Sequence, residues 1–158
     1  MPWRAAILLA AAFAFLTISC ASRPPAIQAF PVIAIEIVPN PIIAYPAAGG
    51  AYRFPFEIVV RETGGAAAHV TRVSLNVVAF GALQVYSQEM MADEIRQNGF
   101  SPDIAAGGEL RYRFNPTKKV PDERLFSGVT AHLRVEAVDE NGEAVPPATA
   151  EVTLRKQR

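Results

Sequence analysis

The sequence has few residues of the types that build covalent or metal-held sites: one cysteine, two histidines and one tryptophan in 158 residues. A single cysteine excludes an intrachain disulfide and a site made of several thiolates. The 15 basic and 15 acidic residues balance, so composition gives no reason to expect a nucleic-acid partner. A domain of this kind is held together by its apolar core, and hydrophobic residues make up 51% of the chain.

The one cysteine, Cys20, ends a hydrophobic leader. A single arginine, Arg4, precedes an almost purely apolar run over residues 5–18. A positive charge, a short apolar run and a small residue before the cleavage point are typical of a secretion signal, and the run is shorter than the about 20 residues of a spanning helix. The segment Leu16-Thr17-Ile18-Ser19-Cys20 resembles a bacterial lipobox. This resemblance implies that Cys20 becomes the lipid-modified first residue of the mature protein.

These features divide the chain into three parts. We predict a lipoprotein signal peptide over residues 1–19, the lipidated Cys20 with a Pro-rich tether over residues 20–31, and a β-rich domain over residues 32–156. The tether holds three prolines and no apolar periodicity, and proline fixes φ and removes a donor, so we expect a semi-extended linker. The alternative is that Cys20 is an ordinary apolar residue of a leader cleaved elsewhere.

Alternating apolar residues predict about seven strands in the domain. The clearest run spans residues 52–60, where every second residue from Tyr52 to Val60 is apolar. The first run ends at Pro39-Asn40-Pro41, which indicates an edge strand, and Asn141-Gly142 is a typical hairpin turn. We expect a short strand over 83–86 and a helix over 87–97. The other alternating runs cover 33–37, 73–77, 110–114, 129–137 and 150–154.

This pattern favours two antiparallel sheets packed face to face. The segments 37–41, 60–65 and 135–142 resemble an immunoglobulin-like or fibronectin-type-III-like module of secreted bacterial proteins. The resemblance implies an all-β fold, an immunoglobulin-like antiparallel β-sandwich of about seven strands, preceded by the signal-peptide helix and the tether. The predicted domain lacks the cysteine pair and the tryptophan of antibody domains. The one cysteine, Cys20, and the one tryptophan, Trp3, both precede it. Such modules serve many purposes, so the fold by itself indicates no function.

The strand register predicts which side chains are inside, since a slip of one residue would exchange the two faces. Arg53, Arg72, Arg111 and Arg134 are expected on the outside. The expected core residues are Phe54, Phe56, Ile58, Leu75, Tyr112, Phe114, Leu133 and Val135.

Four arginines form the one candidate binding surface: Arg53, Arg61, Arg111 and Arg113. All four should point outward from two strands that usually lie side by side, as a basic stripe for anionic headgroups, a glycan or a partner protein. Glu57 lies between Arg53 and Arg61 on the same face, so cross-strand ion pairing is the simpler interpretation.

The remaining polar features have ordinary explanations. His69 and His132 are expected as isolated, solvent-facing side chains rather than catalytic or metal ligands. Residues 139–143 contain carboxylates and a glycine, but their spacing departs from a calcium loop and fits a plain turn. The pair Met90-Met91 is either a helix face over the end of the sandwich or an adaptable contact surface. We therefore predict no catalytic, cofactor or metal residues, and no enzyme.

Two functions fit these observations. The first is a lipid-anchored binding or interaction module of the cell envelope, attached to the membrane through Cys20, with an envelope protein or glycan as partner and no nucleic acid. Ala21 rather than Asp follows the cysteine, which by resemblance favours the outer membrane of two-membrane bacteria. The second is an accessory subunit of an envelope complex that pairs through an exposed strand edge, at the proline-broken first strand or within residues 81–106.

Overall fold

The computed structural model describes residues 29–158. The predicted signal peptide, Cys20 and the tether up to residue 28 lie outside the described residues. Within residues 29–158, no helix has the length and apolar character needed to cross a membrane.

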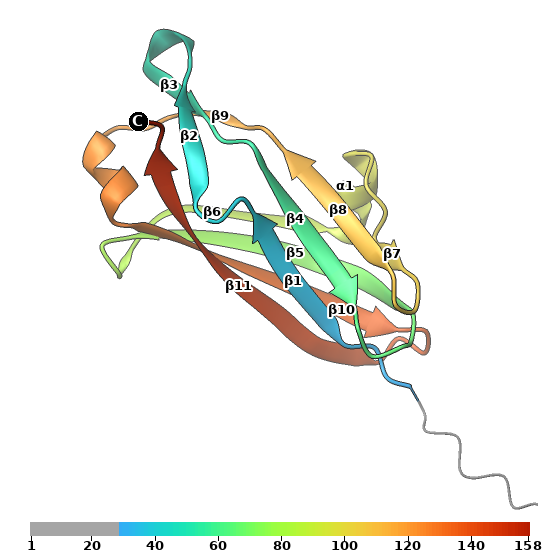
Figure 1. The fold of residues 1–158 in the computed structure, drawn as a ribbon. Coiled ribbons are helices and arrows are strands. Elements are labelled where there is room, and N and C mark those ends of the chain that lie inside the picture. Colours follow the sequence, from blue (N-terminus) through green and yellow to red (C-terminus); the bar gives the residue numbers. More distant parts are fainter. Residues whose placement is uncertain (1–28) are drawn as a thin grey trace, which may run out of the picture.

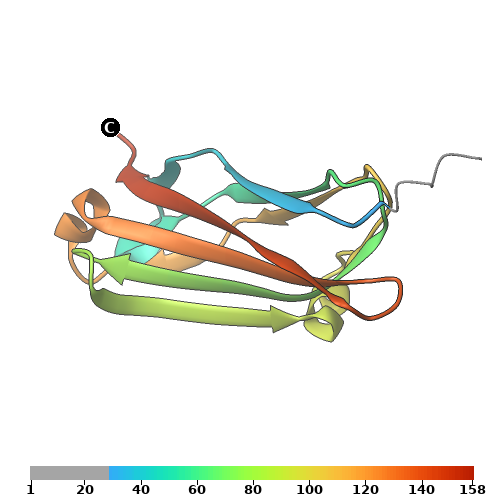
Figure 2. The same ribbon diagram turned by 90° about the horizontal axis from the view of Figure 1, so that it is seen from below.

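The described chain folds as a two-layered β-sandwich of the immunoglobulin-like class, as predicted (Figures 1 and 2). The small sheet has the strand order β1-β4-β8 and the large sheet the order β6-β5-β10-β11-β2-β3-β9, with β7 paired to β5. Seven strands of the described part have six residues or more: β1 (Ile33–Val38), β4 (Phe56–Glu62), β5 (Ala68–Ala79), β6 (Leu83–Met91), β8 (Glu109–Phe114), β10 (Val129–Asp139) and β11 (Ala144–Lys156). The shorter elements are β2 (Ile42–Pro46), β3 (Ala51–Arg53), β7 (Asp103–Ile104), β9 (Thr117–Lys119), α1 (Ala92–Gln97) and the 3-10 helices η1 (Ala48–Gly50) and η2 (Glu123–Ser127).

Prolines end one of the predicted strands and divide another. β1 is an edge strand and ends before Pro39-Asn40-Pro41, where both X–Pro bonds are cis. The chain then crosses to the large sheet as β2, which pairs with β11 in parallel. We expected only antiparallel pairs, so this parallel pair is a departure. It arises because the chain changes sheets after β1, and the direction of β11 in the large sheet is independent of the strand directions in the small sheet.

Pro55 breaks the predicted run 52–60 into β3 and β4. Proline has no N–H to donate to a neighbouring strand. The residue before it, Phe54, donates its backbone N–H to the carbonyl of Pro116, at 2.9 Å. β3 consequently pairs with β2 and β9, while β4 pairs with β1 and β8.

The predicted helix over 87–97 is correct only at its C-terminal half. β6 continues to Met91, which pairs with Arg72 of β5, and α1 begins at Ala92. Cross-strand pairing over the whole length of β5 overrides the local helical preference of residues 87–91. Met90 therefore packs against the core from a strand, and Met91 stays 51% exposed at the start of α1.

The core lies wholly within residues 33–152, so the described domain buries its own apolar surface and can fold as a unit. Ile58, Tyr112, Leu133 and Val135 are buried, as predicted. Phe54 is also buried, at 9% exposed. The predicted core residues that are only half-buried are Phe56, Leu75 and Phe114. These three residues face a space between the sheets that is not filled.

A buried carboxylate organises the end of the sandwich where the tether leaves. Glu62 is 2% exposed, and its oxygens accept the backbone N–H groups of Val32, Gly64, Gly65 and Gly107 at 2.6–3.1 Å. Burial alone would raise the pKa of this carboxyl, but the four N–H donors outweigh burial and lower it to about 2. One side chain thus connects the tether end, the β4–β5 turn and the loop before β8.

We predict that Glu62→Gln lowers the free energy of unfolding by about 2–3 kcal/mol at pH 7, because an amide replaces a charged acceptor of buried N–H groups. A carboxyl with a lowered pKa stabilises the fold above its ordinary value, near 4.5, and this contribution is lost as pH falls toward 2. Urea denaturation between pH 7 and pH 2 should therefore show that the free energy of unfolding falls less steeply with decreasing pH in the variant than in the wild type. The control is Glu140→Gln in the exposed β10–β11 turn, and equal curves for both variants would contradict the assignment.

Candidate functional site

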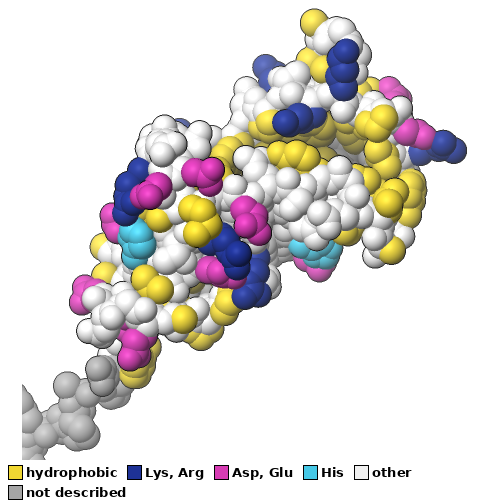
Figure 3. Space-filling model, turned by 180° about the vertical axis from the view of Figure 1, so that it is seen from behind, with side chains coloured by type: hydrophobic (Ala, Val, Ile, Leu, Met, Phe, Trp, Pro, Cys, Tyr) yellow, Lys and Arg dark blue, Asp and Glu magenta, His cyan; other side chains and the backbone are white. Residues whose placement is uncertain are grey.

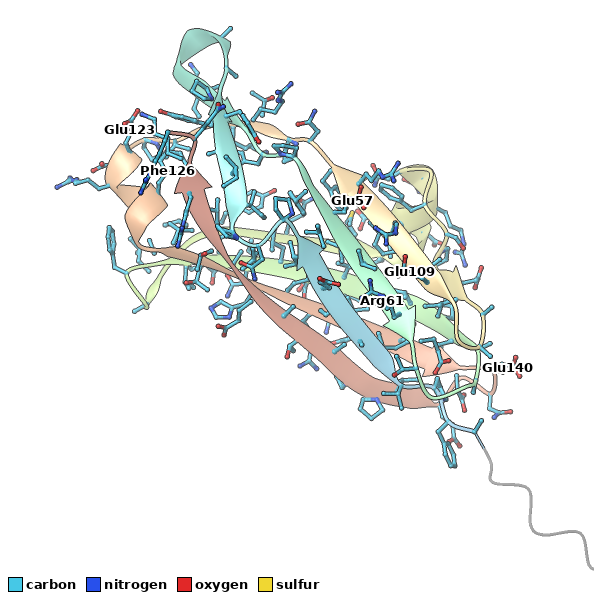
Figure 4. All side chains as sticks on the ribbon, in the orientation of Figure 1. Glu57, Arg61, Glu109, Glu123, Phe126 and Glu140 are labelled. Atoms are coloured by element: carbon cyan, nitrogen blue, oxygen red, sulfur yellow. The ribbon has the colours of Figure 1, made fainter. Side chains whose placement is uncertain are left out.

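The structure brings three of the four candidate arginines together. Arg61, Arg111 and Arg113 lie on β4 and β8 and form ion pairs with Glu57 and Glu109. Figure 4 labels Glu57, Arg61 and Glu109 on these two strands. Arg53 lies beyond the Pro55 break on β3, with its guanidinium 5.8 Å from the centre of the Tyr45 ring.

The three arginines are neutralised by three glutamates. Ion pairs of 2.7–3.1 Å run in one chain, in the order Glu36, Arg61, Glu109, Arg111, Glu57, Arg113. Hydrogen bonds from Arg111 and Arg61, respectively, are the main reason that the pKa values of Glu57 and Glu109 lie below their ordinary range. The face is an ion-paired ladder, which matches the simpler of the two interpretations from the sequence.

Val59 shows what this ladder does for the fold. By alternation Val59 belongs to the outer face of β4, yet it is 0% exposed. Its cross-strand neighbours are Glu36 and Arg111. The apolar stems of long charged side chains cover such a residue while their charged ends stay in water. The ladder therefore acts as a cover over the small sheet.

Neither histidine is isolated, contrary to the prediction. Nδ1 of His69 lies 2.6 Å from Oδ1 of Asp103, and Nδ1 of His132 lies 3.0 Å from Oε1 of Glu151. Each histidine and its carboxylate are part-exposed cross-strand partners. His69 and Asp103 join β5 to β7, and His132 and Glu151 join β10 to β11. Among residues 29–158, no group of three or more His, Cys, Asp or Glu side chains is placed to hold a metal ion.

The carboxylate-containing turn between β10 and β11 is a hairpin, as predicted. Oδ1 of Asp139 accepts the backbone N–H groups of Asn141 and Glu143, both at 2.8 Å. These bonds, led by that from Glu143, lower the pKa of Asp139. Gly142 has a φ of 82°, which a glycine adopts at little cost.

A cleft of about 870 Å³ lies between the two sheets. Its lining includes residues of β6 and β9, which are the two ends of the large sheet's strand order, and of β8 in the small sheet. Figure 3 shows a hollow between the two layers in which hydrophobic side chains gather, with Lys and Arg side chains on one margin. η2 closes one end, where the Phe126 ring packs edge-on against Tyr52 at 4.8 Å between centres.

The walls of the cleft are apolar and come from both sheets. Strand alternation points one face of β5 into it, with Val73, Leu75 and Val77. Opposite them, Phe56 and Phe114 stack with ring centres 5.2 Å apart. Residues that complete the apolar lining include Ile58, Met90, Phe100, Val120, Leu125 and Phe126.

Polar groups are confined to a few positions of the lining. Its charged residues are Arg113, Lys118 and Lys119, and it contains no carboxylate. The ammonium of Lys118 on β9 lies 5.4 Å from the centre of the Tyr86 ring on β6, so this pair spans the opening from margin to margin. The uncharged polar residues of the lining are Tyr86, Gln88, Asn98 and Asn115.

The sequence contained a weak signal for this cleft. An ordinary sandwich core would bury Phe56, Leu75 and Phe114, and their strand positions give no reason to expect otherwise. The signal is the pair of adjacent lysines within residues 117–119, which follows the predicted strand 110–114. Alternation assigns a residue to a face, but it does not report how far the opposite sheet lies from that face.

No family model and no curated protein matches the chain. Similar solved structures include the putative ApaA protein from Bordetella pertussis, with 18% identity over 78% of this chain and 94% of that one, and a TM-score of 0.54. A structural-genomics target solved by X-ray crystallography matches at 14% identity over 77% of this chain and 86% of that one, with a TM-score of 0.52. The CARDB domain of a Pyrococcus furiosus protein, solved with di-metal ions, matches at 16% identity over 82% and 98%, with a TM-score of 0.40. At these identities the likeness concerns the fold alone.

A pair of leucines tests how open the cleft is. Leu75 and Leu133 are direct cross-strand partners on β5 and β10, but Leu75 is half-buried and Leu133 is 1% exposed. We expect Leu133→Ala to lower the free energy of unfolding by about 3–5 kcal/mol and Leu75→Ala by only about 1–2 kcal/mol. The difference arises because Leu75, at the opening, buries less of its apolar surface on folding than Leu133 does. Urea unfolding of the two variants measures both values. Equal costs would mean that the cleft is closed in solution.

Proposed function

We propose that this protein is a lipid-anchored binding module of the cell envelope, that it binds an apolar ligand in the cleft between its sheets, and that it catalyses no reaction. The observation that carries the proposal is the unfilled cleft itself. Proteins pack their interiors densely, so an apolar space of about 870 Å³ between two sheets is a departure that a bound molecule would explain.

The size and chemistry of the cleft support binding. Ligand sites typically have volumes of roughly 300–1,000 Å³, with mostly apolar walls and a few polar groups that orient the ligand. The cleft meets each of these conditions. Its lining consists of aliphatic and aromatic side chains, amides, a phenol and cations, which are groups that hold and orient a molecule. Met90 supplies a flexible side chain that adapts to different occupants.

The anchor rests on the sequence. Lipidation of Cys20 would place the domain at a membrane, facing the periplasm or the cell surface, and Ala21 favours the outer membrane where the host has one. Ala29–Pro31, at the end of the tether, lie against the β4–β5 turn, where a Cβ on Gly64 would overlap the carbonyl oxygen of Phe30. η2, which closes one end of the cleft, lies at the far end of the sandwich from this attachment (Figure 1).

We predict that the domain, produced without residues 1–20, binds the neutral probe N-phenyl-1-naphthylamine with a saturable rise in fluorescence. Val77→Trp should abolish this signal, because the indole fills the space between β5 and the small sheet. The control is Val78→Trp, since Val78 is the next residue of β5 and does not line the cleft.

Thermal melting of both variants establishes that each is folded before binding is compared. Binding by the wild type and Val78→Trp but not by Val77→Trp supports the proposal. Absence of saturable binding to the folded wild type would refute the cleft as the site, and equal binding by both variants would place the probe elsewhere.

We further predict that the full chain, expressed in bacteria with labelled fatty acid, is labelled and sediments with membranes. Cys20→Ser removes the thiol that accepts the lipid, so it should abolish the label and the processing that depends on it. Two or three acyl chains hold a protein at a membrane essentially permanently, whereas one chain binds only marginally. An unlabelled wild type in the soluble fraction would contradict the anchor and leave a freely secreted domain.

A second candidate function follows from the outer edge of β6. β6 ends the strand order of the large sheet, and Leu83 and Val85 are 61% and 42% exposed. An exposed edge of this length can accept a strand from a partner protein, as expected for an accessory subunit of an envelope complex. A partner that co-purifies equally with the wild type and with Val77→Trp would favour this function over binding in the cleft.

A further inference from the structure

The charges at the opening of the cleft specify its ligand. We propose that the cleft takes a single-chain amphipathic carboxylate, of the long-chain fatty acid class, with its tail between the sheets and its carboxylate at Lys118 and Lys119. This inference rests on the proposed function, because it names the ligand of the same site.

The first argument is the sign of the charge. The charged residues of the lining are all cationic: Arg113, Lys118 and Lys119. Arg113 already pairs with Glu57 at 2.8 Å. Lys118 and Lys119 contact no carboxylate among residues 29–158, so their charges are left for a ligand.

The acids nearest in sequence do not compensate the two lysines. Asp122 pairs with Arg124 at 2.5 Å, and this contact lowers the pKa of Asp122. Glu123 accepts the Nζ of Lys156 at 2.8 Å and also the hydroxyl of Tyr52. Each carboxylate is therefore engaged with other groups, although the chain is neutral overall. The unpaired positive charge at the opening is a local feature.

The second argument is the contact that spans the opening. The ammonium of Lys118 rests over the Tyr86 ring. Cation–π contacts at exposed sites are weak, so a carboxylate can replace the ring as the partner of the ammonium. The exchange would leave a lysine above the ligand's polar end and a tyrosine beside the start of its tail.

The third argument is the shape of the apolar part. The walls are the inner faces of two sheets, with Phe56 and Phe114 on one side and Leu75 and Val77 on the other. Phe100, in the loop after α1, packs beside Phe114. Facing sheets lie about 10 Å apart, a separation normally filled by their own side chains. A space left between them suits a narrow, flexible chain with its one charged end at the opening.

The experiment is displacement of N-phenyl-1-naphthylamine from the domain without residues 1–20. Three ligands with the same ten-carbon chain are compared: decanoate, decanol and decyltrimethylammonium. We expect decanoate to displace the probe at roughly five- to tenfold lower concentration than decanol, and decyltrimethylammonium to be the weakest. The preference for decanoate should shrink as salt is raised, since the lysines are exposed.

The double variant Lys118→Glu/Lys119→Glu should reverse this order, with decyltrimethylammonium the strongest of the three. Arg155→Glu/Arg158→Glu is the matched control, because it changes the net charge equally at exposed residues outside the cleft. The control should keep the order of the wild type.

The outcomes separate this inference from the proposed function. If the neutral probe binds and decanoate, decanol and decyltrimethylammonium displace it equally, the cleft binds apolar molecules but the carboxylate assignment is wrong. The same conclusion follows if the control double variant changes the order as much as the lysine variant does. If the probe does not bind the folded wild type, the proposed function itself fails.

Discussion

The carboxylate of Glu62 is the interaction on which the arrangement of this sandwich depends. A buried charge is costly unless hydrogen bonds satisfy it, and here four backbone N–H groups from three chain segments do so. This satisfaction is possible only because the β4–β5 turn approaches the incoming chain closely, with Gly64 against the carbonyl of Phe30. The tether end, β4 and the loop before β8 are thereby held in one place, and that end of the sandwich is closed.

The side of the sandwich between β6 and β8 is not held together in this way. β6 and β8 are edge strands of different sheets, and residues of both line the apolar space between them. The domain therefore forgoes some dispersion contacts and the full burial of Phe56, Leu75 and Phe114. Natural sequences depart from consistent packing mainly at functional sites, and this reasoning makes the cleft, rather than the surface arginines, the place to look for function.

The two sets of cations differ in how far they are compensated. Arg61, Arg111 and Arg113 lie in an alternating chain of ion pairs that covers Val59 and leaves no net charge. Exposed ion pairs of this kind contribute little to stability one by one, so the ladder matters mainly as a cover. Lys118 and Lys119 have no carboxylate partner within residues 29–158. Positive charge without a carboxylate partner, next to an apolar space, is what an anionic ligand can use.

The sequence by itself determined the class of fold, the approximate places of the seven long strands except the second half of β6, the edge position of β1 and the hairpin at Asn141-Gly142. These features follow from alternation, proline and turn chemistry, which act locally. It also predicted that the strands bearing Arg61 and Arg111 lie side by side, and that Glu57 pairs across them. Only the tertiary structure decided where the strands break and change sheets, because the hydrogen-bond partner of Phe54 and the cross-strand partner of Met91 are distant in sequence. The cleft was likewise decided there: alternation states that Leu75 faces inward, while the separation of the two sheets depends on contacts made by the whole chain.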